Sequence, residues 1–132
     1  MAQINTLTDL KNNLTIHTIR DEMKLHDIIY IVEKYYKSAQ TKNLIWNLLD
    51  ASLSHINSNE ANEGVKITST LMKIIGKEIP GSKTAILVSK SVDFGICRIY
   101  HAHAEYEVSH MEYKVFYNNI EDAKTWMGIS IE

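Results

Sequence analysis

One segment restricts the fold of this chain more than any other. Residues 44–49 are apolar at every position except Asn47, so the segment is apolar on both faces. Such a strand is typical of a sheet with helices over both sides, because a bare face would expose apolar surface to water. Residues 84–88 form a second short run of buried character. These two runs predict an α/β protein with a covered central sheet.

Strand and helix patterns alternate along the rest of the chain. The β-prone runs at residues 4–10 and 14–19 are separated by Lys11-Asn12-Asn13, and asparagine tolerates the left-handed backbone of tight turns, so a hairpin is expected. The other expected elements are helices near residues 25–36, 57–76, 92–108 and 119–127, and a strand over residues 113–117. The order ββαβαβαβα predicts one domain over residues 1–132, with a single-layer mixed sheet of about five strands and about four helices. Every strand after the hairpin is expected to be parallel.

Asparagines are expected to begin two of these helices. Asn57 and Glu60 have the spacing of a capping box, with asparagine in place of serine or threonine. Asn119 precedes the last helix, whose apolar stripe consists of Ile120, Ala123, Trp126 and Met127.

Composition and charge exclude several classes of function. The net charge is −2 and only Arg20 and Arg98 are arginines, so the chain lacks the basic field that holds nucleic acid. The lone cysteine, Cys97, cannot form an internal disulfide, which is typical of a reducing compartment. No apolar run approaches the roughly 20 residues of a membrane span, and residues 1–5 lack the pattern of a secretory signal. A cytoplasmic protein without a transmembrane segment is therefore expected.

The second half of the chain resembles a known family. The pattern consists of a helix opening with Phe94, Gly95 and Arg98, a strand with Val115 and Phe116, a helix with Glu121, Ala123 and Trp126, and Asp50 after an apolar strand. It resembles the bacterial SpoIIAA-like proteins, which are related to the STAS domains of anti-sigma-factor antagonists and to CRAL-TRIO lipid-transfer folds. The resemblance implies a STAS-like fold, and a fold alone does not specify a function.

The resemblance also implies a phosphorylation switch that this sequence does not reproduce. STAS antagonists carry a phosphorylated serine in an aspartate–serine–serine–glycine motif at the start of their second helix. Here residues 50–60 contain serines without that motif, and Glu60 and Glu63 already place negative charge in the first turn. Ser58 is therefore interpreted as a helix cap, and phosphorylation of a serine within residues 52–58 stays open.

No catalytic, cofactor or metal motif is evident. His101 and His103 would point about 200° apart on a helix, so they cannot chelate one ion. Cys97 and His101 share a helical face, but no second Cys/His pair joins them. The glycine-rich motifs that hold phosphates or dinucleotides are missing. The sequence therefore predicts no metal, no cofactor and no catalytic residue.

Four residues form the predicted binding site. Phe94 and Arg98 lie four apart on the third expected helix, and Asp50 and Ser52 follow the first central strand. Because ligands of open α/β sheets bind beyond the carboxyl ends of the strands, these residues are interpreted as one site. In it, Asp50 and Ser52 supply a polar edge, Phe94 an apolar contact and Arg98 a charge. The structural alternative is that Phe94 packs under a loop and Arg98 pairs within the fold.

The function favoured by these observations is regulatory and non-catalytic. The protein would dock a protein partner, or a small anionic or lipidic ligand, near the loop after Asp50 and the start of the Phe94 helix. Two alternatives stay open: a lipid-binding or peripherally membrane-associating module, and a small enzyme with a cleft near Cys97 and His101. The sequence also leaves open a homodimer formed through an edge strand or a helix ridge.

Overall fold

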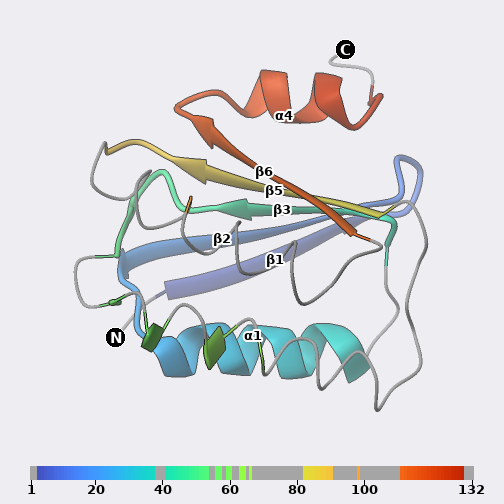
Figure 1. Cartoon of the computed structure of the whole chain (residues 1–132). Coiled ribbons are helices and arrows are strands. Elements are labelled where there is room, and N and C mark those ends of the chain that lie inside the picture. The colour runs from blue at the N-terminus through green and yellow to red at the C-terminus, as the bar shows by residue number, and fades with distance from the viewer. Residues whose placement is uncertain are drawn as a thin grey trace.

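The protein is built on one mixed sheet, seen edge-on in Figure 1. The computed structural model describes residues 3–37, 41–53, 56–57, 59–60, 63–64, 66, 82–90, 98 and 111–129. The sheet has six strands in the described part of the chain. Five lie in the spatial order β1-β2-β3-β5-β6: β1 (Gln3–Asp9), β2 (Leu14–Glu22), β3 (Asn43–Asn47), β5 (Ser82–Val88) and β6 (Met111–Tyr117). The sixth, β4 (Ala51–Ser52), pairs with β2. The hairpin strands β1 and β2 are antiparallel, and all other pairs are parallel, as the sequence predicts.

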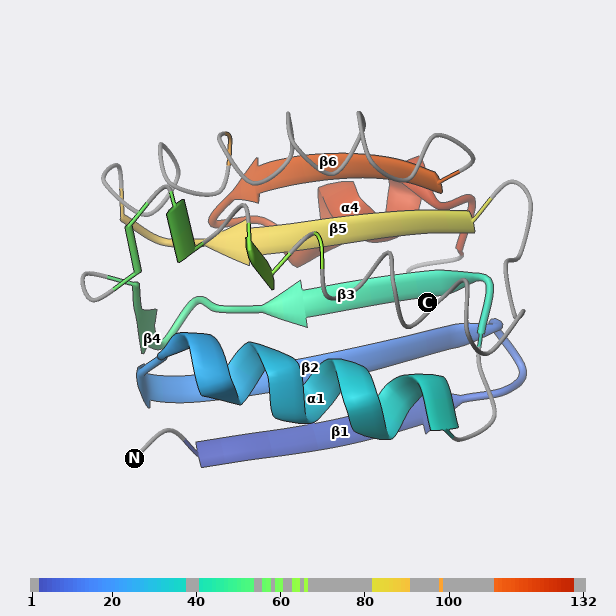
Figure 2. The ribbon, with the colours of Figure 1, turned by 60° about the horizontal axis from the view of Figure 1, so that its bottom comes forward.

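Two described helices lie on opposite faces of this sheet. Helix α1 (Leu25–Lys37) runs along one face, over the β1–β2 side, whereas α4 (Ile120–Trp126) lies behind β5 and β6 (Figure 2). In the described part of the chain, no helix is long and apolar enough to cross a membrane.

The two faces have separate apolar cores. On the α1 face, even-numbered residues of β3 and β5 such as Trp46 and Ile86 pack with α1 residues such as Ile28 and Val32. On the α4 face, odd-numbered residues of β3 and β5 pack with residues of β2, β6 and α4 in a second cluster: Leu14, Ile45, Ala85, Leu87, Phe116 and Ala123. The central strands are therefore buried on both sides, which confirms the interpretation of their apolar sequence.

Several local predictions are confirmed. Asn13 adopts a φ of 51° in the hairpin turn, the left-handed conformation expected of asparagine there. The Asn57 capping box is complete, since Asn57 Oδ1 accepts the Glu60 N–H at 2.9 Å and Glu60 Oε1 accepts the Asn57 N–H at 3.3 Å. The apolar stripe of the last helix also packs as predicted, against the sheet.

The elements differ from the prediction in three places. Strand β2 continues to Glu22 rather than ending at residue 19, and the sequence analysis missed the two-residue strand β4 (Ala51–Ser52) with which its end pairs. Two complete helices are described rather than four. The predicted helices at 57–76 and 92–108 fall mostly outside the described residues. Within these two ranges, the described residues 59–60, 63–64, 66 and 98 have helical backbone.

The cap of α4 gives a direct test of how this short helix is held. Asn119 Oδ1 accepts the Asp122 N–H at 3.1 Å from an extended backbone, as an N-cap does. Asn119→Ala should lower the free energy of unfolding by about 1 kcal/mol, because one N–H of the first turn loses its acceptor. Urea denaturation measures this loss. Asn119→Asp is the matched control, since it keeps an acceptor oxygen and should stay within about 0.5 kcal/mol of the wild type; equal losses in both variants would contradict the capping role.

Candidate site at the carboxyl edge of the sheet

The predicted site residues Asp50 and Ser52 lie where β2 and β3 end. After β3 the chain turns, and β4 runs parallel to the end of β2, with Ala51 opposite Asp21 and Ser52 opposite Glu22. The Asp21 N–H donates to the Asp50 carbonyl at 3.1 Å, and the Met23 N–H donates to the Ser52 carbonyl at 2.9 Å. The main chain of this edge is therefore held on both sides of Ala51.

The turn between β3 and β4 is anchored by polar contacts. The Asn47 side-chain oxygen accepts the Leu49 N–H at 3.2 Å, which explains the one polar residue in an otherwise apolar run. Ser89 Oγ, just beyond β5, donates to the Leu49 carbonyl at 2.7 Å. The Leu48 N–H donates to the Leu87 carbonyl at 2.9 Å. Because three elements hold this turn, Asp50 projects from a well-determined backbone.

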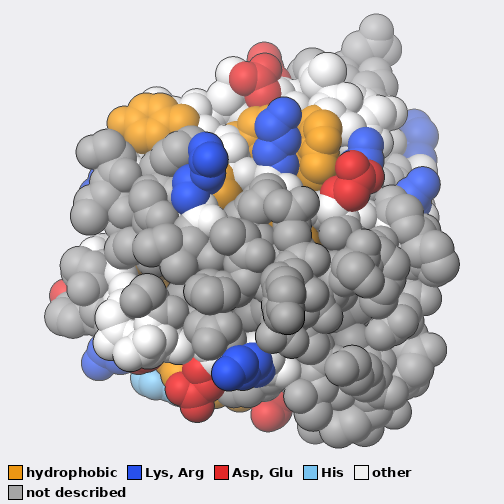
Figure 3. All heavy atoms as spheres, viewed as in Figure 1, with side chains coloured by type: hydrophobic (Ala, Val, Ile, Leu, Met, Phe, Trp, Pro, Cys, Tyr) orange, Lys and Arg blue, Asp and Glu red, His pale blue; other side chains and the backbone are white. Residues whose placement is uncertain are grey.

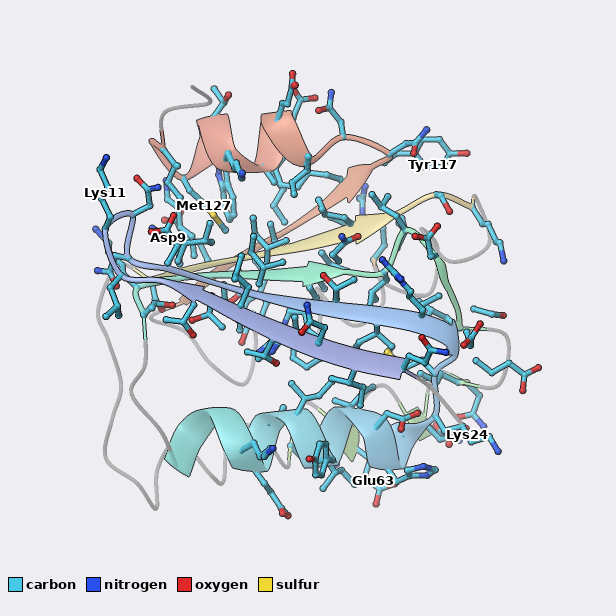
Figure 4. All side chains as sticks on the ribbon, turned by 180° about the vertical axis from the view of Figure 1, so that it is seen from behind. Asp9, Lys11, Lys24, Glu63, Tyr117 and Met127 are labelled. Atoms are coloured by element: carbon cyan, nitrogen blue, oxygen red, sulfur yellow. The ribbon has the colours of Figure 1, made fainter. Side chains whose placement is uncertain are left out.

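Negative charge gathers at this edge. Asp21, Glu22 and Asp50 are all exposed; the Asp21 N–H donates to the Asp50 carbonyl, Glu22 is the next residue of β2, and the exposed Arg20 precedes Asp21. We call the three acidic residues the acidic edge. Asp21 and Glu22 are the last two residues of β2, and both side chains are exposed to solvent. Figure 4 shows Lys24 and Glu63 at the same end of the molecule, where α1 begins. Asp21 has a φ of 68°, a left-handed conformation that aspartate tolerates.

Ser52 lies half-buried within β4. Glu22 lies opposite Ser52 in the strand pair, which disfavours an added phosphate there because like charges would repel. The acidic edge also disfavours an anionic ligand and favours a cationic one.

The structure does not unite all four predicted residues. Phe94 lies outside the described residues, as do Cys97 and His101, which the enzyme alternative invokes. Arg98 has helical backbone and an exposed side chain, and it takes part in an interaction within the protein. Among the described residues, no group of three or more His, Cys, Asp or Glu side chains is arranged to hold a metal ion.

Lysines elsewhere on the described surface cover apolar side chains. Figure 3 shows lysine and hydrophobic side chains side by side around β6 and α4. Lys114 Nζ lies 5.3 Å from the centroid of the Phe116 ring, and Lys83 Nζ lies 5.1 Å from that of Trp126. Lys83 Nζ also donates to the Trp126 carbonyl at 2.8 Å, at the C-terminal end of α4. These contacts give both lysines a structural role in packing and helix capping.

In the described part of the chain, the buried His17 is the one titratable group whose pKa is shifted far from its ordinary value. His17 is 2% exposed, its ring centroid lies 5.2 Å from that of Trp46, and its Nδ1 lies 2.8 Å from Thr6 Oγ1. Burial lowers the pKa of His17 to about 4, so the ring is neutral at pH 7. It faces the α1-side core, away from the acidic edge, and its role is structural. The alternation of β2 places His17 on the same face as Ile19, but sequence alone does not reveal its depth of burial.

No protein-family model matches this sequence, and no curated protein matches it either.

Proposed function

We propose that this protein is a non-catalytic binding domain that docks a basic segment of a partner protein at the acidic edge. The observation that carries the proposal is the pairing of β4 with β2, which bonds the Asp50 main chain to Asp21, the neighbour of Glu22, on a backbone anchored by β5. Complementary charge steers such partners together and selects against acidic ones. A relation to the SpoIIAA-like, STAS-related proteins is part of the same proposal. The mixed sheet with its antiparallel N-terminal hairpin supports that relation.

The charge of the acidic edge favours a basic protein partner over a small anion or an anionic lipid. Small anions and anionic lipid headgroups would meet three carboxylates at this edge, which is unfavourable. The enzyme alternative depends on Cys97 and His101, which lie outside the described residues.

Selection from a random peptide library displayed on phage tests the proposal. Peptides enriched on the wild-type protein should carry lysine and arginine, and Asp50→Lys should weaken their binding by about tenfold or more, because it reverses a charge at the centre of the edge. The measurement is the Kd of the best synthetic peptide. Glu33→Lys is the matched control, since Glu33 is an exposed carboxylate in the second half of α1, away from the end of β2 where the acidic edge lies. Enrichment of acidic peptides, or equal Kd values for both variants, would overturn the proposal.

Arg98→Ala in the same assay decides whether Arg98 belongs to this site. If it does, the variant binds the basic peptide more tightly, because a repelling positive charge is removed, while the melting temperature stays nearly unchanged. A lowered melting temperature with unchanged binding by the folded fraction would make Arg98 structural.

Native mass spectrometry of the purified protein compares protein docking with the lipid-binding and enzyme alternatives. A mass equal to that of the chain is expected, and a co-purified lipid or metabolite would count against protein docking.

A further inference from the structure

Strand β1 is an edge strand without the usual protection against pairing. Among the described strands it pairs with β2 alone. Its sequence, QINTLTD, contains no lysine, proline or glycine. Natural proteins blunt exposed edges with such residues or with bulges, because an open edge pairs readily with another chain. The opposite edge strand, β6, contains Glu112 and Lys114.

Backbone geometry determines which β1 residues face outward. The Asn43 N–H donates to the Asn13 carbonyl, so that carbonyl faces β3. In a trans peptide the next N–H, that of Leu14, points the opposite way, toward β1. Strand alternation then directs the main-chain groups of every second β2 residue to β1: Leu14, Ile16, Thr18 and Arg20. Their partners on β1 are odd-numbered, so the N–H and C=O groups of Ile4, Thr6 and Thr8 face outward.

The same strand and its turn hold exposed apolar side chains. Leu7 is 58% exposed and Leu10 is 76% exposed, and they are two of four large hydrophobic residues that stand out in this way in the described part of the chain. Leu7 lies opposite Ile16, whose side chain is partly buried on the α4 face. Helix α4 contacts β5 and β6 rather than the hairpin. The apolar surface at this edge therefore continues from the core outward.

We propose that the protein forms a symmetric dimer in which β1 pairs antiparallel with β1 of a second copy, with the twofold axis at Leu7. In this register Thr6 of each copy exchanges main-chain hydrogen bonds with Thr8 of the other, which are outward-facing positions in both chains. Leu7 meets its own counterpart in a non-hydrogen-bonded pair, where side chains approach most closely. Leu10 comes to the position beside the second copy's Ile4.

The sequence of β1 is complementary to itself in the Leu7-centred register, which favours a second copy of the chain as the partner of this edge. Asp9 lies opposite Asn5, so no like charges are opposed along the pairing, and the only charged residue of β1 gains an amide neighbour. Registers centred on Asn5 or Thr6 are allowed by the outward-facing groups, but they place Leu7 opposite Gln3 or Asn5 and leave the leucines unpaired. A dimer of this kind joins two sheets into one and is an isologous interface. It does not use Asp50 and so stands apart from the proposed function.

Sedimentation velocity between about 1 and 100 µM tests the dimer, since this range covers interfaces of weak to moderate affinity. The wild type should shift from monomer to dimer with concentration, and Leu7→Lys should raise the dimer Kd by about tenfold or more, because it places two ammonium groups opposite each other. Tyr30→Lys is the matched control, since Tyr30 is 51% exposed on α1. Circular dichroism verifies that each variant is folded. A wild type that stays monomeric throughout, or a Leu7→Lys variant that dimerises normally, would overturn the proposal.

Cysteine cross-linking tests the register. In a Cys97→Ser background, which removes the one native thiol, Leu7→Cys should form an intermolecular disulfide under mild oxidation. The Cα atoms of a non-hydrogen-bonded pair lie about 4.5 Å apart, within the range of disulfides. Asn5→Cys should cross-link far less, because its neighbour in the second copy is Asp9. Efficient cross-linking of Asn5→Cys with little from Leu7→Cys would reject the Leu7-centred register.

Discussion

Acidification from pH 7 to pH 4 is expected to lower the free energy of unfolding by about 3 kcal/mol through His17 alone. The folded protein holds the pKa of His17 at about 4 because burial disfavours the charged ring, whereas the unfolded chain protonates it near 6.5. Between these two pH values the unfolded state binds more protons than the folded state. The stabilisation is therefore complete above about pH 6.5 and is lost as the pH falls toward 4.

Urea denaturation at several pH values between 7 and 4 measures this loss. Carboxylates also contribute to acid destabilisation, so the decisive quantity is the difference between the wild type and His17→Phe, which keeps an aromatic ring beside Trp46 and does not titrate. We expect the stability of His17→Phe to fall less steeply with decreasing pH. Thr125→Gln is the control, because Thr125 is an exposed residue of α4 without a titratable group, so the substitution should leave the pH dependence unchanged. Parallel curves for the wild type and His17→Phe would contradict the assignment.

Leu87→Ala should lower the free energy of unfolding by about 3 kcal/mol, within the usual range of about 2–5 kcal/mol for buried leucines. Leu87 is 0% exposed and lies in the cluster between the sheet and α4, together with Ile45 and Ala123. Removing its side chain loses the free energy of transfer from water and leaves a cavity that the central strand β5 cannot close by moving, since β3 and β6 pair with it on both sides.

Leu87→Met is the matched control for this substitution. It nearly conserves the side-chain volume, so its cost should stay below about 1.5 kcal/mol. Urea midpoints and their slopes measure both variants, and an unchanged slope shows that the change lies in stability rather than in the extent of unfolding. Equal losses in both variants would show that shape rather than buried volume dominates at this position, and a loss below about 1 kcal/mol in Leu87→Ala would contradict the buried position itself.

Local signals in the sequence predicted much of the fold. The hairpin turn at Asn13, the capping box of Asn57 and Glu60, and the Asn119 cap all depend on residues a few positions apart, and all are confirmed. The apolar character of β3 and β5 likewise predicted their burial on both faces, because each strand's alternation is local.

The candidate site could be predicted only in part. Asp50 and Ser52 were expected at the carboxyl edge and lie there, but their acidic neighbours Asp21 and Glu22 were not expected beside them. Two-residue strands such as β4 have no periodicity to detect, and Asp21 resembles a surface charge until a partner strand is known. Recognition of the edge as acidic therefore required the strand pairing.

The sequence by itself determined the hairpin, the two buried central strands, the first and last helices and their apolar faces, because these properties arise from propensity, capping and periodicity within short windows. Only the tertiary structure decided which segments become neighbours. It placed Asp50 beside Asp21, buried His17 against Trp46 deeply enough to keep the ring neutral, and left β1 at the edge with Leu7 exposed. Pairing, depth of burial and exposure depend on contacts between residues far apart in the chain, and no local pattern encodes them.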